Sequence, residues 1–466
     1  MLSGEVPRWL GARLGSLAAD LALVVGDAHV LTDREVAAGY AVDWTGRYGA
    51  KRALVVRPAT TAETSAVVDL AASYGVPIVT QGGNTGLVGG SVPNRHDSLI
   101  VSTRRLGTIS DVDLRAGLVT VGAGVTVTGL TEHLKGSGWR FAVDLGSRDS
   151  ATLGGMTATN AGGMRVFRFG TMRRQIVGLE YVAADGTVAS HLRSLIKDNT
   201  GYHLAGLLCG SEGTLGLITA LRLRLIRERT HRLAALCAFD DLDEAVEFAW
   251  QLRATAPSVE VIEYLDAACA DLVHMTQRVP LPVRGQALIL VEAAADTDPL
   301  DEVAGAIGRI QPSPTDVAFA LGEHRRAALW RLRDEVSLAL SRLGAVHKFD
   351  ISIPAGTLSH VRRRLEAGLH ALAPQATAWW FGHVCDDNVH LNVTGPDLET
   401  HRVEELVVQV VLDAAGSISA EHGIGVMKAP FLHHARSAGE LAHMRAIKEA
   451  LDPQGILNPG VIFAER

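Results

Sequence analysis

The sequence is poor in cysteine, and its cysteines lack the paired spacing of a thiolate zinc site or a disulfide framework. The four cysteines stand at positions 209, 237, 269 and 385, and no Cys-x-x-Cys pair occurs. Such widely separated cysteines argue against a zinc ribbon and against a disulfide-stapled secreted fold. We therefore expect a reducing, cytoplasmic location.

Long apolar runs and an excess of basic residues are also missing. No apolar stretch approaches the roughly 18 residues of a membrane-spanning helix. The N-terminal apolar segment is interrupted by Asp20 and is followed by no small-residue cleavage pattern, so no signal peptide is expected. Acidic residues outnumber basic ones by 51 to 44, giving a net charge of −7. The basic footprint of a nucleic-acid-binding protein is absent, and no nucleic-acid partner is expected.

Three common nucleotide and nucleophile motifs are absent as well. The sequence contains no Gly-x-Gly-x-x-Gly, no Gly-Lys pair and no Gly-x-Ser-x-Gly. These absences exclude a Rossmann NAD fingerprint, a P-loop and the nucleophile elbow of the α/β-hydrolases.

The pattern of apolar residues and glycines divides the 466-residue chain into sections. Strands are predicted at 53–57, 76–80 and 99–102, with a helix over 61–74 that Thr61 would cap. Short β-like runs and glycines continue to about residue 227, where a more helical region begins. We expect domains over 1–227 and 228–415, and a C-terminal segment over 416–466 in which the glycine-rich character returns.

Glycine-rich loops are the first candidate binding feature. Five glycines fall within the loop at 81–94, at positions 82, 83, 86, 89 and 90. Backbone N–H groups of such a loop can approach an anion such as a pyrophosphate, because no Cβ stands in the way. Segments 145–170 and 210–219 add glycines together with Ser, Thr and Asn, which suit ribityl hydroxyls and a flavin edge. An irregular turn region without a ligand is the alternative.

Histidines and a carboxylate form the second candidate feature. Residues 379–394 read as a β-hairpin around the turn Cys385–Asn388, which would bring His383 and His390 together. Period-two alternation places Asn392 on the face of His390, and Glu421 and His422 follow downstream. Two imidazoles and one carboxylate suit a catalytic zinc or another first-row ion, including the Fe(II) of a non-haem oxygenase. Alternatively, each His is an ordinary packed or surface residue.

A group of cations could bind a substrate carboxylate. Arg331 and Arg333 lie in a segment with helical spacing, and Lys348 follows it. A bidentate guanidinium suits a carboxylate. The alternative is a solvated helix face.

The stretch RPATTAETSAVVDLAASYGVPIVTQGGNTGLVGGSVP, followed in order by TNAGG, KDNTGYHL and GSEGTLG, resembles the vanillyl-alcohol oxidase flavoprotein superfamily, in particular its D-2-hydroxyglutarate and D-lactate dehydrogenase branch. The resemblance runs from about residue 43 to the C-terminal end. It implies an α+β fold with a two-subdomain FAD-binding domain of the PCMH type. A substrate (cap) domain with an antiparallel sheet would follow, and the C-terminal segment would return to the FAD domain.

The resemblance also assigns site residues. FAD would be bound by Gly82, Gly83, Asn84, Thr85, Gly86, Leu145, Gly146, Thr152, Gly154, Gly155, Thr159, Asn160, Gly162, Glu212 and Ile218. The first loop contains neither His nor Cys, so non-covalent FAD is expected. The metal would be held by His383, His390 and Glu421, the substrate by Arg333, Ser337, Lys348 and Asn392, and His422 would be the catalytic base. The family turn Gly-Asp-Gly-Asn is replaced here by Cys385-Asp386-Asp387-Asn388.

The reaction that the resemblance implies is oxidation of a D-2-hydroxy acid, favouring D-2-hydroxyglutarate, to the 2-oxo acid by hydride transfer to flavin N5 beside a zinc ion. D-Lactate and glycolate are alternative substrates within the family. A non-catalytic FAD-binding subunit of a complex is an alternative of another class. The enzyme would need an electron acceptor such as an electron-transfer flavoprotein or a quinone, and a homodimer is compatible with this reading.

Overall fold

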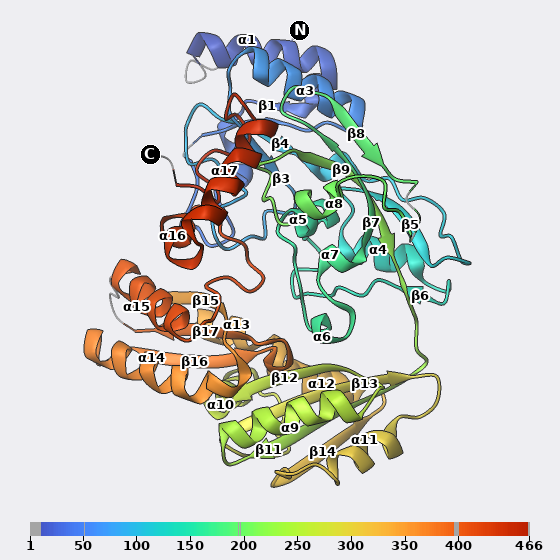
Figure 1. The fold of residues 1–466 in the computed structure, drawn as a ribbon, viewed down its shortest axis with the longest axis vertical. Coiled ribbons are helices and arrows are strands. Elements are labelled where there is room, and N and C mark those ends of the chain that lie inside the picture. Colours follow the sequence, from blue (N-terminus) through green and yellow to red (C-terminus); the bar gives the residue numbers. More distant parts are fainter. Residues whose placement is uncertain (1–10, 51, 194, 196, 396–399, 465–466) are drawn as a thin grey trace. The chain divides into compact units, whose positions relative to one another are not determined.

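The computed structural model of the chain describes residues 11–50, 52–193, 195, 197–395 and 400–464 (Figure 1). Helices and sheets form two compact units. Unit 1 consists of residues 1–162, 170–228 and 421–466, and unit 2 consists of residues 163–169 and 229–420.

Unit 1 begins with a small, mostly parallel sheet in the order β1-β2-β4-β3. Its strands are β1 (Val30–Leu31), β2 (Leu54–Val56), β3 (Ile78–Gln81) and β4 (Leu99–Ser102), and its helices are α1 (Gly11–Val25), α2 (Arg34–Ala41) and α3 (Thr61–Ser73). Leu17, Leu54 and Val67 belong to one apolar core between this sheet and helices α1 and α3. The predicted cap of α3 was wrong by one residue, because Thr60 is the residue whose side chain accepts the N–H of Glu63.

A second, antiparallel sheet completes unit 1 in the order β5-β9-β7-β8. Its strands are β5 (Leu118–Gly122), β7 (Ile176–Val182), β8 (Val188–His191) and β9 (Leu217–Arg224), and a two-stranded ribbon joins β6 (Trp139–Arg140) to β10 (Ile226–Arg227). The helices of this part are α4 (Val127–Leu134), α5 (Leu153–Ala158), α7 (Met172–Gln175) and α8 (Leu204–Leu208).

Unit 2 is built on one antiparallel sheet in the order β14-β11-β13-β12-β16-β17-β15. The strands are β11 (His231–Phe239), β12 (Val259–Asp266), β13 (Ala287–Ala295), β14 (Asp316–Leu321), β15 (Val346–Ser352), β16 (Thr377–Gly382) and β17 (Asn388–Thr394). The helices are α6 (Val166–Phe169), α9 (Leu242–Thr255), α10 (Ala267–Gln277), α11 (Leu300–Ile307), α12 (Glu323–Asp334), α13 (Val336–Ser341), α14 (Leu358–Leu372) and α15 (Thr400–Asp413).

The two faces of the unit 2 sheet carry different helices. Helices α10, α12 and α13 share one apolar core with Leu265 and Leu290. On the opposite face, Phe248 of α9 packs on Phe239 with ring centroids 5.0 Å apart, and Arg362 of α14 pairs with Asp266. Because side chains alternate along each strand, the register of the sheet decides which polar residues face the first group of helices.

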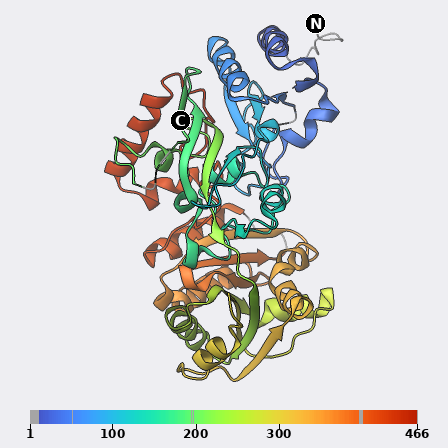
Figure 2. The ribbon, with the colours of Figure 1, turned by 90° about the vertical axis from the view of Figure 1, so that its right-hand side faces the viewer.

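The C-terminal segment, drawn in red in Figures 1 and 2, returns to the small sheet of unit 1. It carries α16 (Leu432–Ala435) and α17 (Ala438–Leu451), and Leu457 forms a parallel bridge with Ile78. Nζ of Lys448 donates to the carbonyls of Thr214 and Leu457 at 2.9 and 2.7 Å and pairs with Asp452, whose side chain has no exposed surface. No helix in the described part of the chain is long and apolar enough to cross a membrane.

Replacing Lys448 with Met should destabilise unit 1 by about 3–5 kcal/mol, because the substitution leaves the buried carboxylate of Asp452 without its cation. Chemical denaturation measures the loss. The matched control is Lys135→Met, since Lys135 forms an exposed pair with Glu132 and its side chain is 68% exposed. That control should change stability by less than about 1 kcal/mol. Equal effects of the two substitutions would contradict the argument.

Candidate functional site

The first glycine loop follows directly after strand β3 in unit 1. Asn84 has a left-handed backbone with φ of 56°. A Cβ on Gly83 would lie 2.0 Å from the carbonyl oxygen of Ser150, so only glycine fits there. Among the described residues, the backbone N–H groups of Gly83, Thr85 and Gly86 have no hydrogen-bond acceptor. Free N–H groups around a left-handed residue form a concavity for an anion.

A second glycine-rich segment packs against this loop. Thr152 caps helix α5 by accepting the N–H of Gly155, and a Cβ on Gly82 would lie 2.3 Å from its hydroxyl. A Cβ on Gly154 would lie 2.5 Å from the side chain of Ala123. A Cβ on Gly146 would have open space around it. Close packing therefore explains why positions 82, 83 and 154 are glycine, whereas Gly146 lies where a ligand could approach.

The remaining predicted FAD residues also lie in unit 1, with different surroundings. Asn160 accepts the N–H of Arg173, and the hydroxyl of Thr159 donates to the carbonyl of Gly155. Ile218 is buried on strand β9. Leu145 is half-buried beside the core of the second sheet.

Glu212 is buried in unit 1 and binds the C-terminal segment. Its carboxylate accepts the N–H groups of Ile424 and Gly425, both at 2.8 Å. Burial raises the pKa of Glu212, and the two N–H groups oppose that shift. The carboxylate therefore fixes the backbone three residues beyond Glu421. Sequence reasoning did not foresee this role.

The two glycine loops fit a flavin dinucleotide. They combine backbone N–H groups without acceptors, a left-handed turn and a position where no side chain intrudes, which together suit a pyrophosphate. Residues 82–86 would hold it. Thr152, Thr159 and Asn160 supply polar groups nearby.

The predicted hairpin of unit 2 forms as expected from β16 and β17. His383 follows the last residue of β16, and His390 lies within β17, directly opposite Phe381. Their rings meet edge to face with centroids 5.2 Å apart. Glu421 follows Ala420, whose N–H donates to the carbonyl of Asp350 in β15. Asn392 lies two residues after His390 in β17, so the two side chains lie on the same face of the sheet.

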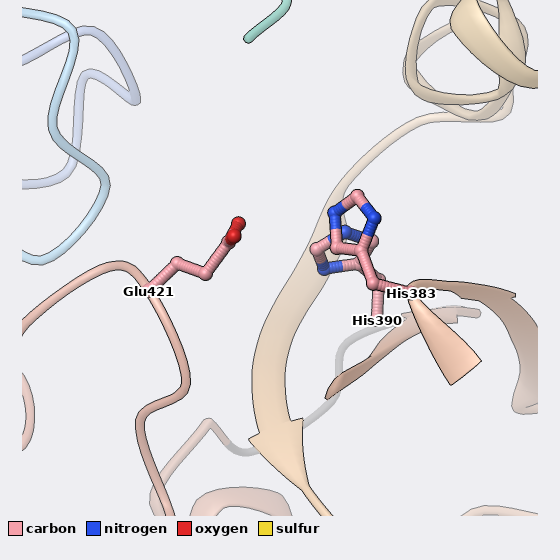
Figure 3. A group of neighbouring side chains, drawn as sticks. All are labelled: His383, His390 and Glu421. Carbon is pink, nitrogen blue, oxygen red and sulfur yellow. The ribbon is translucent and has the colours of Figure 1, made fainter. Parts of the chain in front are cut away.

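One possible ligand atom from each of His383, His390 and Glu421 lies within 4.8 Å of the other two. Figure 3 shows the carboxylate of Glu421 directed toward the two imidazoles. Two imidazoles and a carboxylate form a donor set that suits zinc and other first-row ions. The residues present therefore fit a divalent metal.

The turn between the histidines contains a left-handed residue that is not glycine. Asp387 has φ of 64°, which Asp tolerates better than most residues. Its carboxylate accepts the N–H of Ala355, and its carbonyl accepts the N–H of Ile353. Burial raises the pKa of the Cys385 thiol. The turn thus joins β16 and β17 as a hairpin.

Each histidine of the group has a buried carboxylate partner. Nδ1 of His383 contacts Oε1 of Glu263 in β12, and Nδ1 of His390 lies 3.5 Å from Oδ1 of Asp350 in β15. The side chains of Glu263 and Asp350 have no exposed surface. Carboxylates at this nitrogen set the tautomer and orientation of a metal-binding imidazole.

Burial and neighbouring charges shift the titration of this region. Burial lowers the pKa of His390 to about 4, so its imidazole is neutral at pH 7. Burial tends to raise the pKa of Glu263, but its neighbours His383 and Arg333 hold it at about 2. Burial raises the pKa of Asp386 to about 7.

The predicted substrate residues are spread over four elements of unit 2. Lys348 is paired with Asn392 across β15 and β17, on the sheet face of His390 and Asp350. Burial lowers the pKa of Lys348. Ser337 lies on α13.

Arg333 of α12 donates through Nε to Oε2 of Glu263 at 2.6 Å and lies over the ring of Phe381, 4.8 Å from its centroid. The Nε–H group of Arg333 is therefore already occupied by a partner within the protein. His422 is half-buried and follows Glu421 directly.

Glu263 and Asp350 were not predicted from the sequence. A signal for Glu263 exists, because it is a charged residue in VEVIEYLD, a strand in which every position is buried. Asp350 lies in the DISIP stretch, and its register opposite His390 depends on a pairing between distant segments.

The buried carboxyl of Asp386 predicts a pH-dependent stability. The unfolded state has a pKa near 3.8 for this group and the folded state one of about 7, so between these values the folded state binds the extra proton. Stability that is present below pH 3.8 is lost as pH rises toward 7. Asp386→Asn should therefore raise the thermal unfolding midpoint of the metal-free protein more at pH 8 than at pH 5. Asp316→Asn, at an exposed strand end, is the control. A pH-independent difference would contradict the prediction.

Comparison with known proteins agrees with these features. Residues 228–462 match a model described as FAD linked oxidases, C-terminal domain, and residues 52–190 match a FAD binding domain. Among solved structures, the chain is similar to 4-ethylphenol oxidase from Gulosibacter chungangensis, with a TM-score of 0.76 at 17% identity, covering 100% of both chains. It is also similar to p-cresol methylhydroxylase, with a TM-score of 0.76 at 15% identity, covering 98% of both chains. These structures confirm the expected vanillyl-alcohol oxidase type of fold.

Several relatives match most of the chain. The D-2-hydroxyglutarate dehydrogenase of Bos taurus is 34% identical over 92% of this chain and 80% of its own length. The D-2-hydroxyglutarate dehydrogenase of Xanthomonas citri pv. viticola is 34% identical over 91% of this chain and 92% of its own length. A protein of Schizosaccharomyces pombe named a putative D-lactate dehydrogenase is 31% identical over 90% of this chain and 83% of its own length. The chain therefore belongs to the family of FAD-linked oxidases that includes the D-2-hydroxyglutarate dehydrogenases, and it is a FAD-dependent oxidoreductase.

Proposed function

We propose that this protein oxidises a D-2-hydroxy acid, D-2-hydroxyglutarate in particular, to the 2-oxo acid with FAD and a divalent metal ion. The observation that carries the proposal is the group of two imidazoles and one carboxylate within 4.8 Å, in a chain of this FAD family. The names of the Bos taurus and Xanthomonas relatives support the choice of substrate. Zinc is the proposed ion, because two nitrogen donors and one oxygen donor leave a coordination position open for a substrate.

Bound FAD would supply the hydride acceptor, and a bound divalent ion would supply Lewis acidity toward the substrate's 2-hydroxyl. His422 would take the hydroxyl proton, since an imidazole titrates in the required range. The cations of Arg333 and Lys348 would bind and orient the substrate carboxylate, with Ser337 and Asn392 as hydrogen-bonding groups. Holding the substrate in one orientation brings its C2–H bond to the same position in each turnover.

D-Lactate is the second candidate substrate. The relative in Schizosaccharomyces pombe is named a putative D-lactate dehydrogenase, and Arg333 and Lys348 suit any carboxylate. The two substrates differ by the second carboxylate of hydroxyglutarate, which a site for that substrate must bind with a further cation.

Anaerobic addition of D-2-hydroxyglutarate should bleach the visible flavin absorption of the purified protein. Removing the metal with a chelator should slow this reduction at least about 100-fold, because a Lewis acid contributes several kcal/mol. Added zinc should restore the rate. L-2-Hydroxyglutarate is the substrate control, and dithionite should reduce the flavin in every sample.

Each other outcome of this experiment would contradict a different part of the proposal. Faster bleaching by D-lactate than by D-2-hydroxyglutarate would make D-lactate the preferred substrate. Bleaching at full rate in the chelated protein would exclude the metal from the reaction. A flavin spectrum that no hydroxy acid bleaches would indicate a non-catalytic FAD-binding subunit.

His422→Ala should lower the rate of flavin reduction about 10²–10⁴-fold, the usual contribution of a positioned general base. FAD content and zinc content should stay at the wild-type level. His433→Ala, at an exposed position on α16 of the same C-terminal segment, is the matched control and should reduce flavin normally. Full activity of His422→Ala with FAD bound would show that the base is another residue.

A further inference from the structure

Glu263 has two oxygens with two different partners, and both partners belong to the proposed site. Oε1 contacts Nδ1 of His383, and Oε2 accepts from Nε of Arg333 at 2.6 Å. The carboxylate has no exposed surface, so water does not compete for either oxygen. One buried side chain thus touches a candidate metal ligand and a candidate substrate cation.

The contact with His383 determines which ring nitrogen is available. A carboxylate paired with a guanidinium accepts hydrogen bonds and donates none, so Nδ1 of His383 carries the proton. The lone pair of this imidazole then lies on Nε2, the nitrogen left for an ion. The contact also fixes the rotation of the ring, as carboxylates do for histidines in metal centres.

The contact with Arg333 fixes the guanidinium plane. Nε is bound to Glu263, and the group lies over the ring of Phe381 at 4.8 Å. Two constraints on one planar group leave its terminal Nη atoms in a defined direction. A pre-oriented guanidinium binds a carboxylate with less loss of rotamer freedom than a free one.

We propose that Glu263 is a positioning residue that orients His383 for the metal and Arg333 for the substrate carboxylate, so that metal affinity and substrate affinity depend on one buried side chain. The inference rests on the proposed function. It goes beyond that function by assigning a role to a residue that touches neither metal nor substrate.

A neighbouring carboxylate provides the comparison that separates positioning from simple stability. Glu292 of β13 is buried on the same sheet face, with Val261 as its register partner in β12. It accepts from Nη1 of Arg232 at 3.1 Å and from the indole N–H of Trp330. It therefore matches Glu263 in burial, in having an arginine partner and in location, but its hydrogen-bond partners are not candidate metal ligands.

The test compares Glu263→Gln with Glu292→Gln in the FAD-loaded, metal-stripped protein. An amide can accept from His383 or from Arg333, but it presents an N–H group to the other. Zinc affinity, measured by competition with a chromophoric chelator, should fall about 10–100-fold in Glu263→Gln. After zinc is restored at a saturating concentration, KM for the hydroxy acid should rise. Zinc affinity of Glu292→Gln should stay within about twofold of wild type. FAD content and the unfolding midpoint are measured on every variant.

Glu263→Asp is the second variant, since it keeps the charge that balances Arg333 even where the amide variant fails to fold. Its shorter side chain should weaken zinc binding at least about tenfold. Wild-type zinc affinity in both Glu263 variants would overturn the inference, as would equal losses in the Glu263 and Glu292 variants. If the wild-type protein itself binds no zinc, the metal part of the proposed function fails first, and the two failures are distinguishable.

Discussion

The pairing register of three strands, β16, β17 and β15, is the constraint on which the candidate site depends. It sets His390 opposite both Phe381 and Asp350, and Lys348 opposite Asn392. A slip of one residue would move all of these side chains to the other face of the sheet. That other face is apolar in this region, with Trp380 and Leu391 fully buried. Burial of these residues therefore specifies the register, and the register assembles the polar group.

The candidate residues of the two units would contribute to function by different physical means. In unit 1 the candidate FAD residues would act largely through their backbone, because the loop around the left-handed residue Asn84 leaves N–H groups without acceptors among the described residues. In unit 2 the candidate residues would act through polar and charged side chains, carried by the sheet and by the helices on one of its faces. Backbone recognition suits a cofactor that is the same in every turnover, whereas charged side chains suit a small anionic substrate that must bind and leave.

Local patterns in the sequence predicted the parts of the structure that depend on local physics. Glycine clusters marked the loops after β3 and before α5, and two apolar runs around Cys385–Asn388 marked the hairpin that brings His383 to His390. The partners of these histidines were missed, because Glu263 lies 120 residues before His383 and no period or motif connects the two. The role of Glu212 was missed for the same reason, since its carboxylate accepts N–H groups more than 200 positions along the chain, 212 and 213 residues away. Contacts of this kind follow from topology rather than from spacing.

Buried carboxylates are costly, and their arrangement in unit 2 indicates that they are retained for a reason other than stability. Apolar residues at positions 263 and 292 would suit the surrounding strands, since replacing a buried ion pair by well-packed apolar groups is often neutral or stabilising. Glu292 and Glu263 each pair with an arginine, so the charge of each is compensated within the sheet. The difference lies in the second oxygen, which in Glu263 is directed to His383 and in Glu292 to Trp330. A carboxylate that only balanced an arginine would have no need of an imidazole, so the geometry around Glu263 is better explained by orientation of His383 than by charge compensation alone.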